Sequence, residues 1–165
     1  MKKIISISIL IIILLSIIFY IKNKNNETVQ YTVDDQKIVL DKGSFKDAVE
    51  TDPPSKIRYF GNEAKTDLDD DGKVDSVFLI TLNSGGTGTF FYVLANLNKG
   101  NHIEGSKGYF IGDRISPQTT EIGEGNSIII NYADRGDDEP FSAEPSIGKS
   151  LRLKFNKKDR SFEKI

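Results

Sequence analysis

Two stretches decide the fold: SVFLITL at 76–82 and TFFYVLANL at 89–97. Both are rich in β-branched, aromatic and aliphatic residues, and both carry apolar side chains on the two faces that a strand presents. A strand of this kind is usually buried on both sides, inside a sandwich or beneath a covering element. The residues between them, NSGGTG, predict a turn. We therefore expect an antiparallel hairpin at the centre of the protein.

Shorter strands are predicted around this hairpin, because apolar residues recur with period two rather than 3.6. Residues 28–33 and 37–40 flank a turn and predict a second hairpin. Residues 42–51 are the best helix candidate, and a short strand is expected at 57–60. The other expected strands are 108–111, 119–122, 127–132, 150–155 and 161–165.

Roughly nine or ten short strands with frequent turns predict a mostly β fold, with an antiparallel sandwich- or barrel-like domain. A chain of 165 residues fits one such domain comfortably. We place this domain at 25–165, after a separate N-terminal segment.

The N-terminal segment at 4–21, IISISILIIILLSIIFYI, carries no charge. As a helix with about 1.5 Å rise per residue it would be roughly 27 Å long, close to the apolar thickness of a bilayer. We expect residues 1–24 to be a signal-anchor containing one transmembrane helix, or a cleaved signal peptide. Bulky Phe19, Tyr20 and Ile21 stand where a cleavage site needs small residues, which favours the uncleaved anchor.

Composition bounds the function further. The chain has 22 Lys and Arg, 24 Asp and Glu, one His and no Cys. Without the four lysines of 1–24, the remainder has 18 basic and 24 acidic residues, a net charge of −6. This balance argues against a nucleic-acid partner, and the missing cysteines exclude disulfides and a lipid-modified Cys. We expect a single-pass protein of the bacterial cytoplasmic membrane with its domain outside, or a secreted protein if the segment is cleaved.

The motif that carries chemistry is DLDDDGKVD at 67–75, which has the D-x-D-x-D-G-x-x-D spacing of a calcium loop. Calcium takes roughly six to eight oxygen ligands at about 2.3–2.6 Å. A loop winding around an ion presents alternate side chains inward, which predicts Asp67, Asp69 and Asp71 as ligands. Lys73 would offer its backbone carbonyl, and Asp75 would close the shell directly or through water.

Other positions of the loop refine this prediction. Gly72 permits the sharp turn, and Asp70, between two ligands, is expected to face solvent. Position twelve is Phe78 rather than Glu, so the loop is not an EF-hand. The alternative is an acidic turn held by side-chain to backbone hydrogen bonds. Carboxylates packed without a cation repel one another, which favours the ion.

The loop resembles the calcium loops of FG-GAP-type and thrombospondin type 3 repeats, and this resemblance implies the same Ca²⁺ ligand set. A longer stretch is also similar to an uncharacterised family of small exported bacterial β-domains. It runs from RYFGNEAKTDLDDDGKVD through GDRISPQTTEI to INYADR, at 58–135. That resemblance implies an exported β-rich domain without an established activity.

The catalytic signals are weak. No G-x-S-x-G motif surrounds a serine, and the lone His102 is expected to be an ordinary exposed residue. We predict a membrane-anchored, calcium-stabilised domain that acts without turnover as a binding or envelope-associated module, with an unknown protein or glycan partner. The alternative is a cell-envelope hydrolase that uses carboxylates of the long acidic loop at 133–149.

Overall fold

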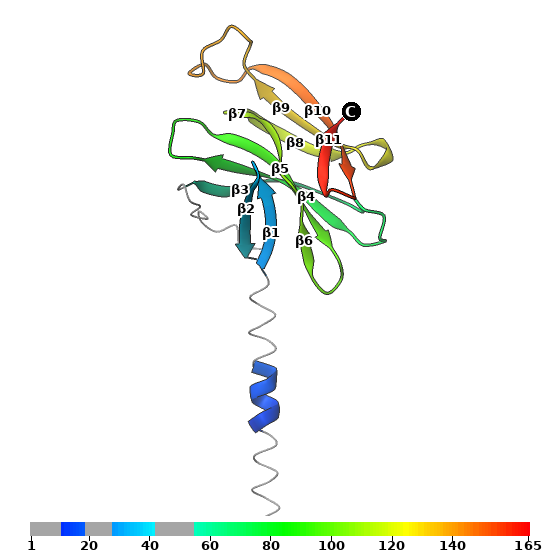
Figure 1. The fold of residues 1–165 in the computed structure, drawn as a ribbon. Helices are drawn as coiled ribbons and strands as arrows, with labels where there is room; N and C mark the ends of the chain where they lie inside the picture. The colour runs from blue at the N-terminus through cyan, green and yellow to red at the C-terminus, as the bar shows by residue number, and fades with distance from the viewer. Residues whose placement is uncertain (1–10, 19–27, 42–54) are drawn as a thin grey trace, which may run out of the picture.

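The fold is given by a computed structural model that describes residues 11–18, 28–41 and 55–165 (Figure 1). Apart from a helix at 11–18, the described residues form mostly strands. The strands are β1 (Thr28–Val33), β2 (Gln36–Asp41), β3 (Lys56–Thr66), β4 (Asp75–Asn83), β5 (Phe90–Asn98), β6 (Ile103–Gly105), β7 (Tyr109–Asp113), β8 (Ser116–Ile122), β9 (Ile128–Asp134), β10 (Ile147–Asn156) and β11 (Ser161–Lys164). A short 3₁₀ helix, Glu124–Asn126, lies between β8 and β9.

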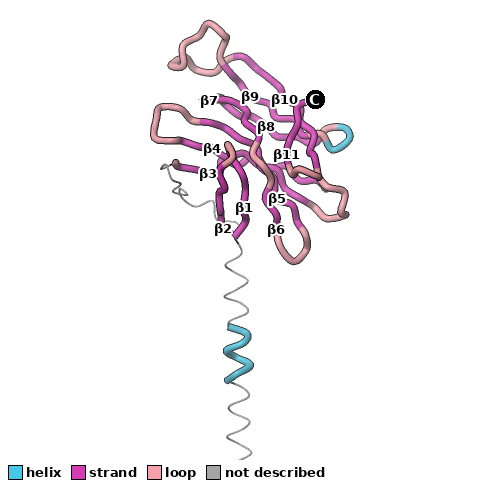
Figure 2. Tube along the Cα trace, viewed as in Figure 1, coloured by secondary structure: helices cyan, strands magenta, loops and turns pink. Residues whose placement is uncertain are grey.

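The strands form three antiparallel sheets, seen as packed layers in Figure 2. The central sheet has the order β3-β4-β5-β6, and β7 pairs with β5 next to β6. A second sheet has the order β11-β10-β9-β8, and β1 and β2 form a separate hairpin. The prediction of a mostly β, antiparallel, sandwich-like fold is confirmed.

Both faces of β4 and β5 are buried, as their sequences predict. One face packs against the second sheet in a core made of Leu68, Val77, Leu79, Val93, Ala95, Leu97, Ile128, Ile130, Leu151, Leu153, Phe155 and Phe162. The opposite face packs against the β1–β2 hairpin in a core made of Val29, Tyr31, Val33, Ile38, Leu40, Ile57, Phe78, Ile80, Tyr92 and Leu94. Alternation along each strand therefore sends successive side chains into two different cores.

The β1–β2 hairpin is closed by Asp34 and Asp35, whose φ angles of 49° and 62° match the tight turns that join antiparallel strands. The hairpin contacts the central sheet between the end of β6 and the start of β7. There the Gly108 N–H donates to the carbonyl of Thr32 at 2.7 Å. At Gly105 the β1 backbone passes so close that an added Cβ would meet the carbonyl of Gln30.

Several predicted boundaries were wrong. The short strand expected at 57–60 continues to Thr66, because register shifts at Gly61 and before Ala64 interrupt the alternation without ending the pairing with β4. β6, at Ile103–Gly105, was not predicted, since three residues are too short to show a period. The helix expected at 42–51 lies outside the described residues.

Of the apolar segment at 4–21, the structure describes residues 11–18, which form a helix with exposed side chains. Within the described ranges, no helix is both long and apolar enough to cross a membrane.

The close approach at Gly105 generates a first prediction. Gly105→Ala should lower the free energy of unfolding by about 1–3 kcal/mol, because the new methyl group forces β1 away from the sheet. Gly148→Ala is the matched control in β10, where an added Cβ meets no atom within 4 Å, and its effect should stay within about 0.5 kcal/mol. Urea unfolding measures both. Equal stabilities of the two variants would contradict the packing of the hairpin.

Candidate cation site

The acidic loop at 67–75 connects β3 to β4 and is held at both ends. Near its start, Leu68 is buried in the core between the two larger sheets, with 4% of its surface exposed. The loop then turns through Asp70 and Gly72, whose φ angles are 56° and 83°. The second value is a backbone conformation that residues other than glycine rarely adopt, and it agrees with the prediction that Gly72 permits the sharp turn.

Asp75 fixes the end of the loop. Its side chain is buried, and both carboxylate oxygens accept backbone hydrogen bonds, one from the Leu68 N–H at 2.9 Å and one from the Asn98 N–H at 2.8 Å. Burial raises the pKa of Asp75, and the nearby charges of Asp69 and Asp71 raise it further, while the two amides oppose this rise. Asp75 therefore ties the loop to itself and to the end of β5.

The carboxylates of Asp67, Asp69 and Asp71 converge. Each offers an oxygen, and these atoms lie within 4.8 Å of one another. Asp67 shapes the turn as well, because its two oxygens accept the backbone N–H groups of Asp71 at 3.1 Å and Gly72 at 2.8 Å. Asp75 is not a member of this converging group among the described residues. The loop thus contains both an acidic turn with internal hydrogen bonds and a cluster of oxygens suited to a cation.

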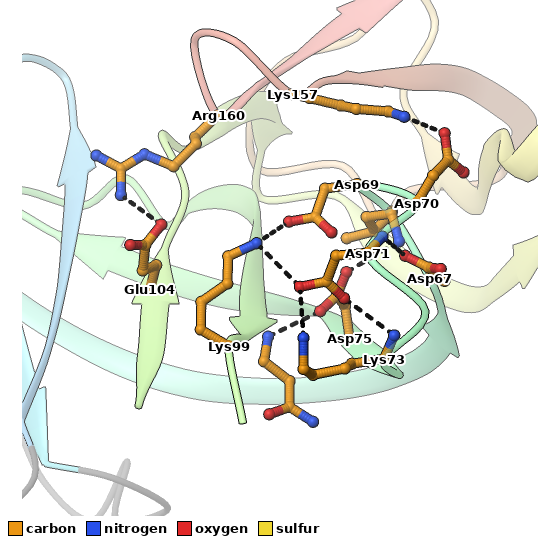
Figure 3. Close-up of polar contacts among 12 residues, drawn as sticks. Asp67, Asp69, Asp70, Asp71, Lys73, Asp75, Lys99, Glu104, Lys157 and Arg160 are labelled. Carbon is orange, nitrogen blue, oxygen red and sulfur yellow. Dashed lines mark hydrogen bonds and ion pairs between the residues drawn. The ribbon is translucent and has the colours of Figure 1, made fainter. Parts of the chain in front are cut away.

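Asp69 holds the most unusual atom of the cluster. Only 10% of its side chain is exposed. One oxygen, Oδ2, pairs with the ammonium of Lys99, whereas Oδ1 is buried and has no hydrogen-bond partner among the described residues (Figure 3). A buried carboxylate oxygen without a partner is costly, so a donor or a cation is expected beside it.

Two lysines approach the cluster from different directions. The ammonium of Lys73 lies 3.1 Å from Oδ2 of Asp71, and that of Lys99 lies 3.4 Å from the same oxygen. Burial raises the pKa of Asp71, but hydrogen bonds from Lys73 and Lys99 outweigh it, and the pKa lies below its usual value. The Asp69 carboxylate in turn raises the pKa of Lys99.

The site also connects the two larger sheets. Asn126, beside the start of β9, donates from its side chain to the carbonyl of Asp67 at 2.8 Å and accepts from the Thr66 hydroxyl at 3.0 Å. Lys157, just after β10, pairs with Asp70. Asp70 itself is directed outward, with 67% of its side chain exposed, as predicted. A ligand that fixes the loop at 67–75 would therefore also fix the contact between the central sheet and the second sheet.

The structure thus brings together three of the predicted side-chain ligands and gives the fourth, Asp75, two backbone partners. Lys73 directs both its N–H and its ammonium to Asp71. The expected contribution of its backbone carbonyl stays a prediction. Lys99 and Asn126 were not predicted. They come from other hairpins, and no sequence spacing relates them to the acidic loop.

The acidic loop predicted at 133–149 is shorter in the structure, because β9 continues to Asp134 and β10 begins at Ile147. The connection at 135–146 lies at the end of the second sheet opposite to the cation site. Asp134 pairs with Lys149 at 2.9 Å, and Gly136 donates its N–H to Glu139 at 2.7 Å. Burial raises the pKa of Asp134, but the Lys149 hydrogen bond outweighs it, so the pKa is lowered. A general acid needs the opposite shift. The lone His102 is exposed, as expected, and contacts Glu104 at 3.3 Å.

Comparison with known proteins gives no match to a family model, a curated protein or a solved structure.

The contacts of Asp75 generate a second prediction. Asp75→Asn should lower the free energy of unfolding by about 1–3 kcal/mol in the presence of a chelator, because its NH₂ group must face one of the two backbone N–H groups. Asp138→Asn, in the exposed loop, removes the same charge and should change stability by less than about 0.5 kcal/mol. Urea unfolding in chelator measures both. A variant as stable as the wild type under these conditions would show that the amide contacts do not anchor the loop.

Proposed function

We propose that this protein is a membrane-anchored, extracytoplasmic β-domain stabilised by Ca²⁺, and that it acts as a non-catalytic binding or envelope-associated module. The observation that carries the proposal is the buried Oδ1 of Asp69, which has no partner in the described ranges, together with the converging oxygens of Asp67 and Asp71. A divalent cation placed among these oxygens satisfies the buried atom and relieves the repulsion between the carboxylates.

Charge supports a cation at this position. Between residues 67 and 75 the loop carries five carboxylates, and three lysines pair with them. Within the described part of the chain, two of these negative charges are therefore left without a basic partner, on a loop that two sheets hold in place. A dication would neutralise them without adding protein groups.

Calcium is the cation that fits the loop chemistry best. Every side-chain ligand offered is a hard oxygen. Mg²⁺ demands near-ideal octahedral geometry and retains several waters, which makes it the poorer candidate for a loop of protein oxygens. Protein carbonyls and water complete many calcium shells, so three carboxylates are a sufficient side-chain contribution. Extracellular calcium modules bind with dissociation constants of about 10⁻⁴–10⁻³ M.

The non-catalytic part of the proposal rests on what the acidic groups do. Asp134 and Glu139 are held by Lys149 and the Gly136 N–H, in a loop whose other carboxylates are exposed. These contacts order the loop. Glycan hydrolysis requires a different arrangement, in which two carboxyl groups face each other across the scissile bond and one of them has a raised pKa. The envelope-hydrolase alternative remains a prediction that no contact favours.

Calcium should raise the thermal stability of the full chain. At a calcium concentration a hundredfold above the dissociation constant, stabilisation is about 2.7 kcal/mol, which corresponds to a rise of roughly 5–10 °C in the unfolding midpoint. Asp69→Asn should lose most of this rise, because it removes the charge at the buried oxygen. Asp70→Asn is the matched control, whose outward side chain leaves the rise intact.

Calorimetric scans in calcium, magnesium and chelator measure these midpoints. An identical wild-type midpoint in calcium and chelator would remove calcium from the proposal. If Asp69→Asn and Asp70→Asn reduce the calcium-induced rise of the midpoint equally, the assignment of Asp69 as a ligand is contradicted.

The apolar segment at 4–21 predicts membrane attachment, which fractionation of bacterial cells expressing the full chain tests. The protein should stay with the membrane after an alkaline carbonate wash and dissolve only in detergent, because an apolar segment of this length partitions into the bilayer. Protease added to the outside of spheroplasts should digest the domain. A soluble product shortened by about 24 residues would instead establish the cleaved signal peptide.

A further inference from the structure

Lys99 is the group that competes most directly with a cation at the candidate site, and the following inference rests on the proposed function. Its ammonium pairs with Oδ2 of Asp69 and lies 3.4 Å from Oδ2 of Asp71. It thus bridges two of the three converging carboxylates, as Figure 3 shows. The ammonium already occupies part of the volume and the charge that a dication would take.

The ammonium satisfies the cluster only partly. Asp69 keeps its second oxygen buried without a partner, and none of the lysine contacts within the described part of the chain reaches Asp67. A single positive charge held by a flexible stem therefore leaves room for a better-coordinated dication. Because like charges repel at contact distance, the ammonium and the dication cannot share these oxygens.

The backbone around Lys99 is fixed independently of its side chain. The Asn98 N–H donates to Asp75 at 2.8 Å, and the Lys99 N–H donates to the carbonyl of His102 at 2.9 Å, inside the turn that joins β5 to β6. The side chain can accordingly swing out towards solvent while the turn stays in place. Exchange of ammonium for cation then requires a rotamer change rather than local unfolding.

We propose that Lys99 is an intramolecular counter-ion that holds the Asp69–Asp71 pair when no cation is bound and that is displaced when Ca²⁺ binds. Lys99 thereby sets the affinity of the site. Its presence keeps the cation-free loop folded, and it shifts calcium binding towards higher concentrations.

The test is a calcium titration of the full chain in detergent by isothermal titration calorimetry at constant ionic strength. Lys99→Met removes the charge and keeps an apolar stem, and it should tighten the calcium dissociation constant at least about fivefold, because a like charge beside the ion is removed. The same variant should melt at a lower temperature than the wild type in chelator.

Two control variants isolate the effect. Lys99→Arg keeps the positive charge beside the same carboxylates and should not tighten the calcium dissociation constant relative to the wild type. Lys157→Met removes an equal charge from the partner of Asp70, outside the converging group, and should also stay within about twofold, because exposed charges are screened by salt.

The outcomes separate this inference from the proposed function. Suppose that the wild type binds calcium. If Lys99→Met then leaves the calcium dissociation constant unchanged, or if Lys157→Met lowers it by the same factor as Lys99→Met, the role of Lys99 is overturned and the calcium proposal stands. If only Lys99→Met binds calcium, Lys99 is the counter-ion and the natural chain is not a calcium protein. If neither the wild type nor Lys99→Met binds, both proposals fail.

Discussion

The constraint on which the rest of the structure depends is the burial of both faces of β4 and β5. Fully apolar strands must be covered on two sides, and this chain covers them with two different structures, the β1–β2 hairpin and the four-stranded sheet. The aromatic side chains of Tyr31, Phe78 and Tyr92 fill the hairpin side, whereas the other side is mainly aliphatic and includes Phe155 and Phe162 of the second sheet. The two covering layers therefore contact different residues of the central sheet.

The acidic loop follows from that arrangement, because it starts the strand that both cores share. Leu68 enters the core, and seven residues later Asp75 begins β4 and receives the Leu68 amide. With its two ends held this closely, the loop must turn sharply, and Gly72 and the Asp67 hydrogen bonds form that turn. The convergence of the carboxylates is therefore a consequence of how the loop is closed. The repulsion among them is partly offset by Lys73 of the loop itself and by Lys99 from another hairpin.

Sequence reasoning reached the features that short-range patterns encode. The two-faced strands, the first hairpin and the left-handed backbone at Gly72 follow from side-chain period and backbone sterics. It could not reach features that depend on long-range contacts. Asp75 matches a ligand position by spacing, yet its partner Asn98 lies 23 residues away, and Lys99 comes from the same distant turn. β3 was cut short because irregular pairing near Gly61 hides the period that identifies a strand.

The proposed cation and the proposed location depend on each other physically. A site whose oxygens are partly neutralised by Lys73 and Lys99 holds a dication less tightly than carboxylates alone would, since each ammonium must move or be repelled. Weak calcium sites fill only where calcium is plentiful, which is the regime of extracellular modules. A domain carried outside the membrane would have its loop loaded with calcium, whereas the lysines would hold the same loop together before export. The acidic cluster and its basic neighbours would together suit the exported chain that we propose, which has to be stable without calcium before export and with calcium afterwards.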